Sequence, residues 1–153
     1  MRNKIKKLFD EKHLTLGSVE SFTGGLFASE VVKIPGASSF FKGSLVTYAT
    51  EEKIRLCGVS KKIIKKYGVV SSECAKEMAV KGLKKLGVDY CVSFTGNAGP
   101  SAMEGKPAGL VYIGFAWKVK GRIETKVIFL QSELSRNELR RKAVQAAEEF
   151  IYD

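Results

Sequence analysis

The segment LTLGSVESFTGG, residues 14–25, joins a strand-like run to a serine and a glycine-rich turn. Leu26 to Lys33 then has the pattern of a helix, so Ser21 would stand at the carboxyl end of a strand, beside unpaired N–H groups of a helix N-terminus. Backbone donors in such a place can hold an oxyanion or a phosphate. The same residues also suit an ordinary Ser/Thr N-cap and a flexible turn, so the motif alone leaves both interpretations open.

The length of the chain, 153 residues, is typical of one domain with a substantial core. We expect a single stand-alone domain over residues 1–153. No apolar run reaches membrane-spanning length, and residues 1–7 lack the apolar region of a signal peptide. A cytoplasmic location without a membrane partner is therefore expected.

Three cysteines, Cys57, Cys74 and Cys91, are spread widely along the chain and have apolar or helical neighbours. An odd number at such spacing indicates neither a disulfide framework nor a zinc cluster. We expect them to be thiols of the core.

Hydrophobic periodicity predicts the remaining elements. The first strand is expected at Leu14–Glu20 and is followed by the helix Leu26–Lys33. The other expected helices are a short one carrying Ile5, Leu8 and Phe9, a helical turn from Thr50 to near Gly58, Ser60–Tyr67, Ser71–Gly87 and Ser135 to about Tyr152. The other expected strands are Gly43–Ala49, Val88–Thr95, Gly109–Val119 and Ile123–Leu130. Strands that alternate with helices, and end in one hairpin, predict an α/β layered fold with a mixed sheet.

The formal net charge is +10. Lysines cluster at residues 4–7, 61–66 and 76–85, which places them on the outward faces of three different helices. No helix-turn-helix, RNA-recognition sequence or zinc finger accompanies them. We therefore favour a solvated surface without a nucleic-acid partner, and keep a nucleic-acid-associated protein as a separate hypothesis.

Several catalytic classes lack their residues in this chain. His13 is the only histidine, and it ends an amphipathic helix rather than a strand, which is a poor place for the base of a Ser-His-Asp triad. There is no His-Glu-x-x-His motif and no clustered acidic loop, so metal catalysis is poorly supported, and a Walker A sequence is absent too. A serine nucleophile would need another base, and a lysine can serve when desolvation lowers its pKa.

Three strand ends are expected to converge, because the carboxyl ends of neighbouring parallel strands form the usual ligand crevice of an α/β sheet. Lys53 and Tyr48 follow the second strand, and the loop Thr95 to Pro100 follows the third. Lys53 is thus the best-placed base for Ser21. It would equally suit a helix surface beside a glutamate, and Tyr48 a half-buried strand position.

Motifs in a specific order relate the chain to a known family. They are Glu20-Ser21-x-Thr23-Gly24-Gly25, Pro35-Gly36-Ala37-Ser38, Gly43-x-x-x-Thr47-Tyr48, Glu51-x-Lys53, Gly58-Val59, Gly68-Val69-Val70-Ser71, Thr95-Gly96-x-Ala98-Gly99-Pro100 and Lys106-Pro107-x-Gly109. In these the chain resembles, over nearly its whole length, the C-terminal domain of the competence/damage-inducible protein CinA, which also occurs alone as nicotinamide-nucleotide amidase.

The resemblance implies a three-layer α/β/α sandwich that hydrolyses nicotinamide mononucleotide to nicotinic acid mononucleotide and ammonia. Ser21 would be the nucleophile, Lys53 the base and Tyr48 their hydrogen-bonding partner, with no metal or organic cofactor. The expected substrate-binding residues are Glu20, Thr23, Gly24, Gly25, Thr95, Gly96, Asn97, Arg136 and Arg140. The phosphate would lie against Arg136, Arg140 or a helix N-terminus, and we expect a homo-oligomer.

The chain departs from the family pattern next to these motifs. Phe22 stands where relatives usually carry cysteine, Asn97 replaces a branched aliphatic residue, and Ser101-Ala102-Met103 replaces Asp-Gly-Gly. The segment before Lys106 is one residue shorter, and Leu134-Ser135 stands where relatives carry Gly-Asp before the arginine of the last helix. These changes motivate an alternative hypothesis, a pyridine-nucleotide-binding module without catalysis.

Overall fold

The structure, a computed structural model, describes residues 2–152 and the side chains of residues 4–151. In it five strands form one mixed sheet in the order β2-β1-β3-β4-β5. The strands are β1 (Leu16–Glu20), β2 (Phe41–Val46), β3 (Tyr90–Gly96), β4 (Leu110–Val119) and β5 (Arg122–Gln131). β1 runs parallel to both β2 and β3, whereas β4 and β5 continue the sheet antiparallel. The expected mixed sheet is confirmed.

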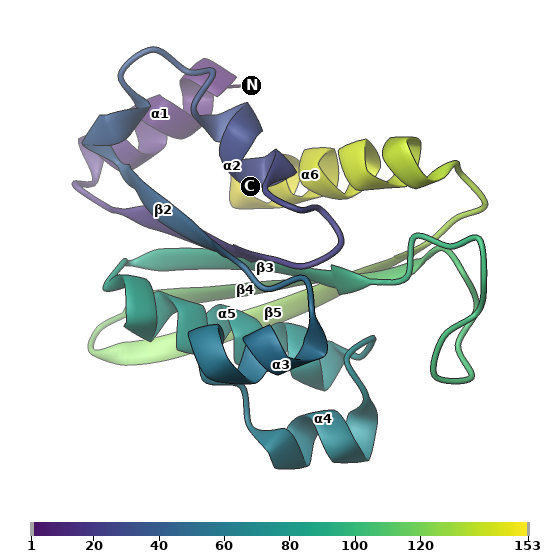
Figure 1. Ribbon diagram of the computed structural model, residues 1–153. Helices are drawn as coiled ribbons and strands as arrows, with labels where there is room; N and C mark the ends of the chain where they lie inside the picture. Colours follow the sequence, from purple (N-terminus) through teal and green to yellow (C-terminus); the bar gives the residue numbers. More distant parts are fainter. Residues whose placement is uncertain (1, 153) are drawn as a thin grey trace.

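Helices cover both faces of this sheet (Figure 1). On one face lie α1 (Arg2–Glu11), α2 (Leu26–Val31) and α6 (Arg136–Tyr152); on the other lie α3 (Thr50–Glu52), α4 (Lys61–Tyr67) and α5 (Ser72–Leu86). A 3-10 turn, η1 (Ala37–Ser39), precedes β2, and a π-helical turn, η2 (Lys53–Cys57), follows α3. A separate hydrophobic core fills each side of the sheet. The predicted three-layer α/β/α sandwich is therefore confirmed.

Small residues let the long helix α5 lie directly on the sheet. A Cβ on Gly82 would stand 2.3 Å from Cγ2 of Val19 in β1, and a Cβ on Gly114 would stand 2.4 Å from the carbonyl oxygen of Ala75. Both glycines are thus required by close approach. The result is that β1, with all five residues buried, is enclosed on both faces, as expected of a central parallel strand.

Several predicted boundaries differ from the structure by one or a few residues, and two of these differences concern where an element ends. β2 ends at Val46 rather than Ala49, because the chain leaves the sheet there and turns toward α3. α2 ends at Val31 rather than Lys33, consistent with Pro35 nearby, since a proline disfavours helical conformation in the residue before it. The first of these differences shapes the site described below.

The three cysteines are free and buried, as predicted. Burial raises the pKa of Cys57 to about 12 and that of Cys74 to about 11, so both are protonated at neutral pH. They are inert core thiols rather than nucleophiles. Between residues 2 and 152, no helix combines the length and apolar character needed to cross a membrane.

Candidate active site

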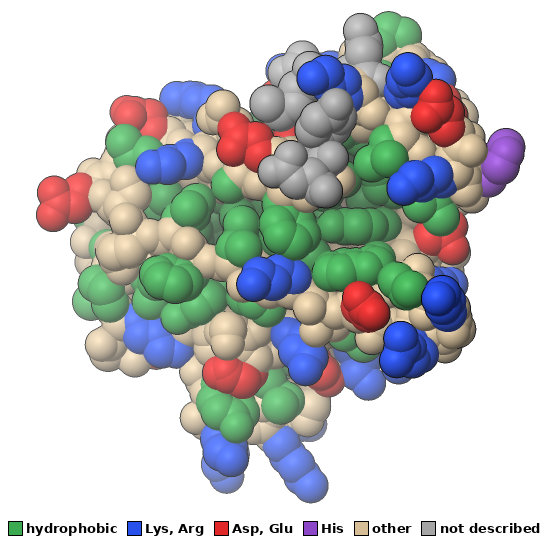
Figure 2. All heavy atoms as spheres, turned by 180° about the vertical axis from the view of Figure 1, so that it is seen from behind, with side chains coloured by type: hydrophobic (Ala, Val, Ile, Leu, Met, Phe, Trp, Pro, Cys, Tyr) green, Lys and Arg blue, Asp and Glu red, His purple; other side chains and the backbone are tan. Residues whose placement is uncertain are grey.

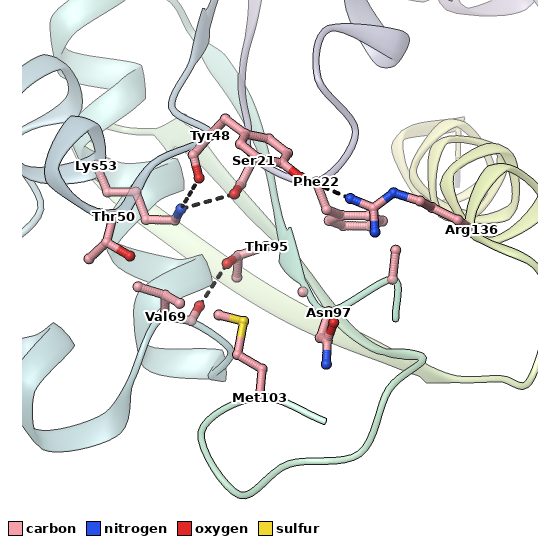
Figure 3. A pocket seen from close by; sticks show the side chains of 12 residues that line it. Ser21, Phe22, Tyr48, Thr50, Lys53, Val69, Thr95, Asn97, Met103 and Arg136 are labelled. Carbon is pink, nitrogen blue, oxygen red and sulfur yellow. Dashed lines mark hydrogen bonds between the residues drawn. The ribbon is translucent and has the colours of Figure 1, made fainter. Parts of the chain in front are cut away.

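The carboxyl ends of β1, β2 and β3 meet at one edge of the sheet, because these three strands are parallel. A pocket of about 150 Å³ opens there. Figure 3 shows side chains from each strand end pointing into it. The lining residues are Ser21, Phe22, Tyr48, Thr50, Lys53, Val69, Thr95, Gly96, Asn97, Ala98, Met103 and Arg136.

Ser21 and Lys53 are in direct contact inside this pocket. Lys53 Nζ lies 2.9 Å from Ser21 Oγ, and the side chains are buried, with 2% of Lys53 and 6% of Ser21 exposed. The backbone N–H of Ser21 donates to the carbonyl oxygen of Phe94 in β3 (3.0 Å), which fixes the serine against the end of that strand. The predicted pair is therefore brought within hydrogen-bonding distance.

The position of Lys53 depends on the irregular backbone around it. The residue opens the π-helical turn η2, and its Nζ lies 3.0 Å from the carbonyl oxygen of Thr47 and 3.5 Å from that of Tyr48. Both carbonyls face the amine because β2 ends early. Single π-helical turns are frequently found at functional sites.

Burial lowers the pKa of Lys53 below its ordinary value. Desolvation is the larger effect; Glu104 and Glu51 oppose the shift, as the thiols of Cys74 and Cys57 would if they were ionised. The amine therefore loses its proton more readily than an exposed lysine.

The surroundings of Lys53 Nζ suit a neutral amine. A neutral amine has two N–H donors and one lone pair. The carbonyl oxygens of Thr47 and Tyr48 can accept the two N–H groups. The structure assigns Lys53 Nζ as donor to Ser21 Oγ (2.9 Å); in the neutral amine the lone pair is left to accept the hydroxyl proton of Ser21 across the same contact. This arrangement would allow Lys53 to act as the base for Ser21.

Tyr48 does not place its phenol between Ser21 and Lys53, as the predicted partnership would require. Its side chain is 60% exposed, and Arg136 Nη2 donates to its hydroxyl oxygen (2.8 Å). Arg136 Nη1 donates to the carbonyl oxygen of Gly99 (2.8 Å). Tyr48 and Arg136 therefore stand together at the mouth of the pocket, and only the backbone carbonyl of Tyr48 reaches Lys53.

Glu20, expected to bind substrate, instead fixes the turn from β1 to α2. Its carboxylate oxygens accept the backbone N–H groups of Phe27 (2.9 Å) and Ala28 (3.0 Å) at the start of α2. The hydroxyls of Ser18 and Ser44 lie 3.2 Å from Glu20 Oε2. The residue is fully buried and does not line the pocket. Its carboxylate serves as a helix cap from within the fold.

Four other expected substrate-binding residues, Thr23, Gly24, Gly25 and Arg140, also lie outside the pocket lining. Gly24 and Gly25 have positive φ angles, which explains the glycines of the turn. Arg140 Nη2 donates to the carbonyl oxygen of Thr23 (2.8 Å), so this arginine ties α6 to the turn. Thr23 Oγ1 and Arg140 Nε are buried without a partner among the described residues.

The other four predicted substrate-binding residues, Thr95, Gly96, Asn97 and Arg136, do line the pocket. Sequence reasoning missed Thr50, Val69 and Met103 as lining residues. Val69 and Met103 come from loops whose path no local pattern reveals. Phe22, by contrast, could be expected at the pocket because it follows Ser21 directly.

Histidine and metal chemistry find no support at this site. His13 is exposed and precedes β1, at the end of the strand opposite Ser21, and Figure 2 shows the histidine at the surface. Within residues 2–152, no three His, Cys, Asp or Glu side chains gather as metal ligands would. The polar side chains that line the pocket carry hydroxyl, amine, amide and guanidinium groups.

Fold and site together define an α/β/α protein with a buried serine–lysine pair at the carboxyl edge of a mixed sheet. The profile of the CinA C-terminal domain matches residues 1–153. The chain belongs to the CinA C-terminal domain family.

Relatives agree with this assignment. A competence-damage inducible protein of Listeria monocytogenes is 46% identical over 141 residues, covering 92% of this chain and 33% of that protein. The chain thus spans about a third of the length of such relatives. A crystal structure of the competence damage-inducible protein A of Klebsiella pneumoniae has a TM-score of 0.88 and 28% identity, covering 99% of this chain and 92% of its own. A competence/damage inducible protein of Agrobacterium tumefaciens has a TM-score of 0.87 and 28% identity, covering 98% and 92%.

Proposed function

We propose that this protein is a serine–lysine amidase that hydrolyses the carboxamide of nicotinamide mononucleotide, giving nicotinic acid mononucleotide and ammonia. The observation that carries the proposal is the 2.9 Å contact between Lys53 Nζ and Ser21 Oγ inside a buried pocket. The substrate is the one that the family resemblance implies. The lowered pKa of Lys53 supports the role of base.

The first half of the reaction forms an ester on Ser21. Neutral Lys53 takes the hydroxyl proton while Ser21 Oγ attacks the amide carbon, and a tetrahedral oxyanion results. The positive pyridinium ring makes this carbon a better electrophile. The protonated amine of Lys53 then donates its proton to the leaving nitrogen, so ammonia departs and the acyl group stays on Ser21.

The second half of the reaction uses water. Lys53, neutral again, accepts a proton from a water molecule as the water oxygen attacks the ester carbon. Collapse of the second tetrahedral species returns the proton to Ser21 Oγ and releases the carboxylic acid. Each half of the reaction returns Lys53 to its starting protonation state, so the cycle balances without a further group.

Backbone N–H groups near Ser21 are candidate donors to the oxyanion. Those of Ser21 and Gly24 are already engaged, with Phe94 and with the Ser21 carbonyl. The N–H groups of Phe22 and Thr23 have no such partner among the described residues. Because Phe22 lines the pocket and Thr23 does not, we assign the oxyanion donor to the N–H group of Phe22. Loss of one such donor typically costs about a hundredfold or more in rate.

Arg136 is the candidate for the substrate phosphate. Its guanidinium lines the pocket mouth, whereas Arg140 is committed to Thr23. A planar guanidinium can contact a phosphate through two parallel N–H donors. Binding there would exchange the contacts of Arg136 with Tyr48 and Gly99 for contacts with the substrate.

Ammonia release from nicotinamide mononucleotide by the purified protein tests the proposal. We expect turnover by the wild type and its loss in both Ser21→Ala and Lys53→Ala, with Lys142→Ala, on the exposed side of α6, as a matched control that keeps the rate. A panel of other carboxamides would show whether the mononucleotide is preferred. A wild-type rate equal to that of Ser21→Ala would refute the proposal.

A binding module without catalysis is the second candidate, favoured by one observation. Phe22 is 5% exposed and lines the pocket beside Ser21, so its ring occupies space next to the nucleophile. Under this hypothesis calorimetry would detect binding of the mononucleotide while no ammonia appears. Turnover that disappears in Lys53→Ala would exclude it.

A further inference from the structure

The loop between β3 and β4 forms one wall of the pocket, and Glu104 attaches it to the segment before α5. The two oxygens of this carboxylate accept the consecutive N–H groups of Val69 and Val70, each at 3.0 Å. Hydrogen bonds to an ionised acceptor are about twice as strong as neutral ones. A side chain at Gly68 would collide with this carboxylate, because a Cβ there would stand 2.7 Å from Glu104 Oε1.

Lys106 binds the carbonyl groups of the same segment. Its Nζ donates to the carbonyl oxygen of Tyr67 (2.8 Å) and to that of Val70. Glu104 therefore holds the N–H groups of this stretch and Lys106 its carbonyls. We call these contacts the Glu104–Lys106 clasp.

The clasp fixes the backbone of Met103. Met103 N donates to the Lys106 carbonyl (3.1 Å), Lys106 N donates to the Met103 carbonyl (2.8 Å), and Gly105 between them has a positive φ. This tight turn sets the direction of Met103, whose side chain lines the pocket. Figure 3 shows Met103 lying near Val69 and Thr95.

The other side of the wall is fixed as well. Thr95 Oγ1 at the end of β3 donates to the carbonyl oxygen of Val69 (2.7 Å), so the segment that the clasp grips is itself attached to the sheet. Val69 and Met103 thus stand on a supported wall, with Phe22 as a third apolar lining residue. Between them the pocket measures about 150 Å³. The lining also carries polar side chains, among them Ser21, Lys53 and Thr95, but in volume the pocket matches a cavity that accepts one benzene ring.

We propose that Met103, held by the Glu104–Lys106 clasp, is a specificity-determining residue that restricts the Ser21–Lys53 site to amides with a single six-membered ring. This rests on the proposed amidase function. A fused bicyclic ring would need the space that the Met103 side chain fills. Release of the clasp would remove the same restriction by freeing the loop.

The experiment compares binding and turnover of two amides, nicotinamide mononucleotide and its analogue with a quinoline-3-carboxamide ring. Dissociation constants are measured by calorimetry in a Ser21→Ala background, where no turnover interferes. Met103→Ala should change the ratio of the two dissociation constants by about tenfold or more in favour of binding the bicyclic amide. Discrimination of this size is typical when a hydrophobic pocket gains or loses the space of a methylene group. Glu104→Ala should shift it in the same direction.

Control variants separate a change in substrate specificity from a loss of folding. Met103→Leu keeps the side-chain volume and should keep the wild-type ratio, and Glu124→Ala, on β5 away from the pocket, should do the same. Thermal unfolding of every variant identifies loss of folding. An unchanged ratio in folded Met103→Ala would overturn the inference.

The ratio of kcat/KM values for the two amides distinguishes this inference from the amidase proposal. Ammonia release by the wild type with an unchanged ratio in Met103→Ala would leave the amidase function standing and refute the role of Met103. A shifted binding ratio without any ammonia release would support the role of Met103 and refute catalysis.

Discussion

Lys53 is the residue whose protonation state decides the proposed chemistry, because an ammonium group cannot take the proton of Ser21. Its pKa is lowered by burial, with Glu104 and Glu51 among the groups that oppose the shift. We expect kcat/KM to rise with pH as Lys53 loses its proton, with a midpoint below 10.5, the value of an exposed lysine. A pH profile of ammonia release checks this. A rate that falls as the pH rises from neutrality would contradict the assignment of Lys53 as the base.

The same lowered pKa makes Lys53 unfavourable for folding. Between the lowered pKa and 10.5 the unfolded chain binds more protons, so stability rises with pH there; below the lowered pKa the cost of burying the charge is complete. We therefore expect Lys53→Met to unfold at a higher temperature than the wild type at neutral pH. A gain of about 1 kcal/mol would raise the midpoint by about 2–4 °C.

Thermal unfolding monitored by circular dichroism measures this effect, and Lys142→Met serves as the exposed control. The variant must also lose its amidase activity if Lys53 is the base. A midpoint several degrees below that of the wild type would mean that Lys53 stabilises the fold, and would remove the link between burial and catalysis.

At the scale of single elements, the start of α2 depends on Glu20. Replacement by glutamine removes an acceptor from the N–H groups of Phe27 and Ala28 in a fully buried place. We expect Glu20→Gln to lower the free energy of unfolding by about 2–3 kcal/mol, measured by urea titration. The KM of the folded variant should stay close to that of the wild type. A large rise in KM with unchanged stability would instead support the substrate-binding role predicted from sequence.

The close contact between α5 and β1 leads us to expect that a larger residue at Gly82 lowers the stability of the fold. Gly82→Ala would place a methyl group 2.3 Å from Val19 Cγ2. Overpacking of this kind costs about 1–3 kcal/mol. Urea titration should show this loss, and Val80→Ala, a partly buried position on the same helix, offers a comparison without a clash. Unchanged stability in Gly82→Ala would show that helix and strand can separate freely.

Most strands and helices could be predicted from the sequence because their periodicity is local. The π-helical turn that positions Lys53 could not, since Thr50 to Cys57 has the composition of an ordinary helix. The turn brings the lysine amine to Ser21, 32 residues earlier in the chain, and no local pattern reveals a contact at that separation. The pairing of Ser21 with Lys53 was predictable from strand order and the lack of a suitable histidine. The exposed phenol of Tyr48 was not, because its contact with Arg136 joins distant parts of the chain.

At the scale of the whole molecule, the three lysine clusters fall on three helices, α1, α4 and α5, which do not all lie on the same face of the sheet. Lys and Arg side chains are spread over the face shown in Figure 2, among hydrophobic and acidic ones. Phosphate-driven binding grows with the number of contacts made at once. We expect no retention of duplex DNA at about physiological salt, measured by fluorescence anisotropy. Binding that persists at that salt concentration would favour the nucleic-acid hypothesis.

The sheet order also explains why one small domain can hold the complete proposed site. Because β1 lies between β2 and β3, Ser21 is flanked by Lys53 on one side and Thr95 on the other. α6 adds Arg136 at the mouth. The Ser21–Lys53 pair, the pocket wall and the candidate phosphate contact thus all come from one layered fold.

The central claim is that Ser21 carries the acyl group during hydrolysis. Its most direct test is an acid quench of the wild-type protein during turnover of nicotinamide mononucleotide, followed by peptide mass spectrometry. We predict an adduct with the mass of the substrate minus ammonia on the peptide that contains Ser21, and no adduct in Ser21→Ala. Ammonia release that continues at the wild-type rate in Ser21→Ala, or an adduct on a different residue, would contradict the claim.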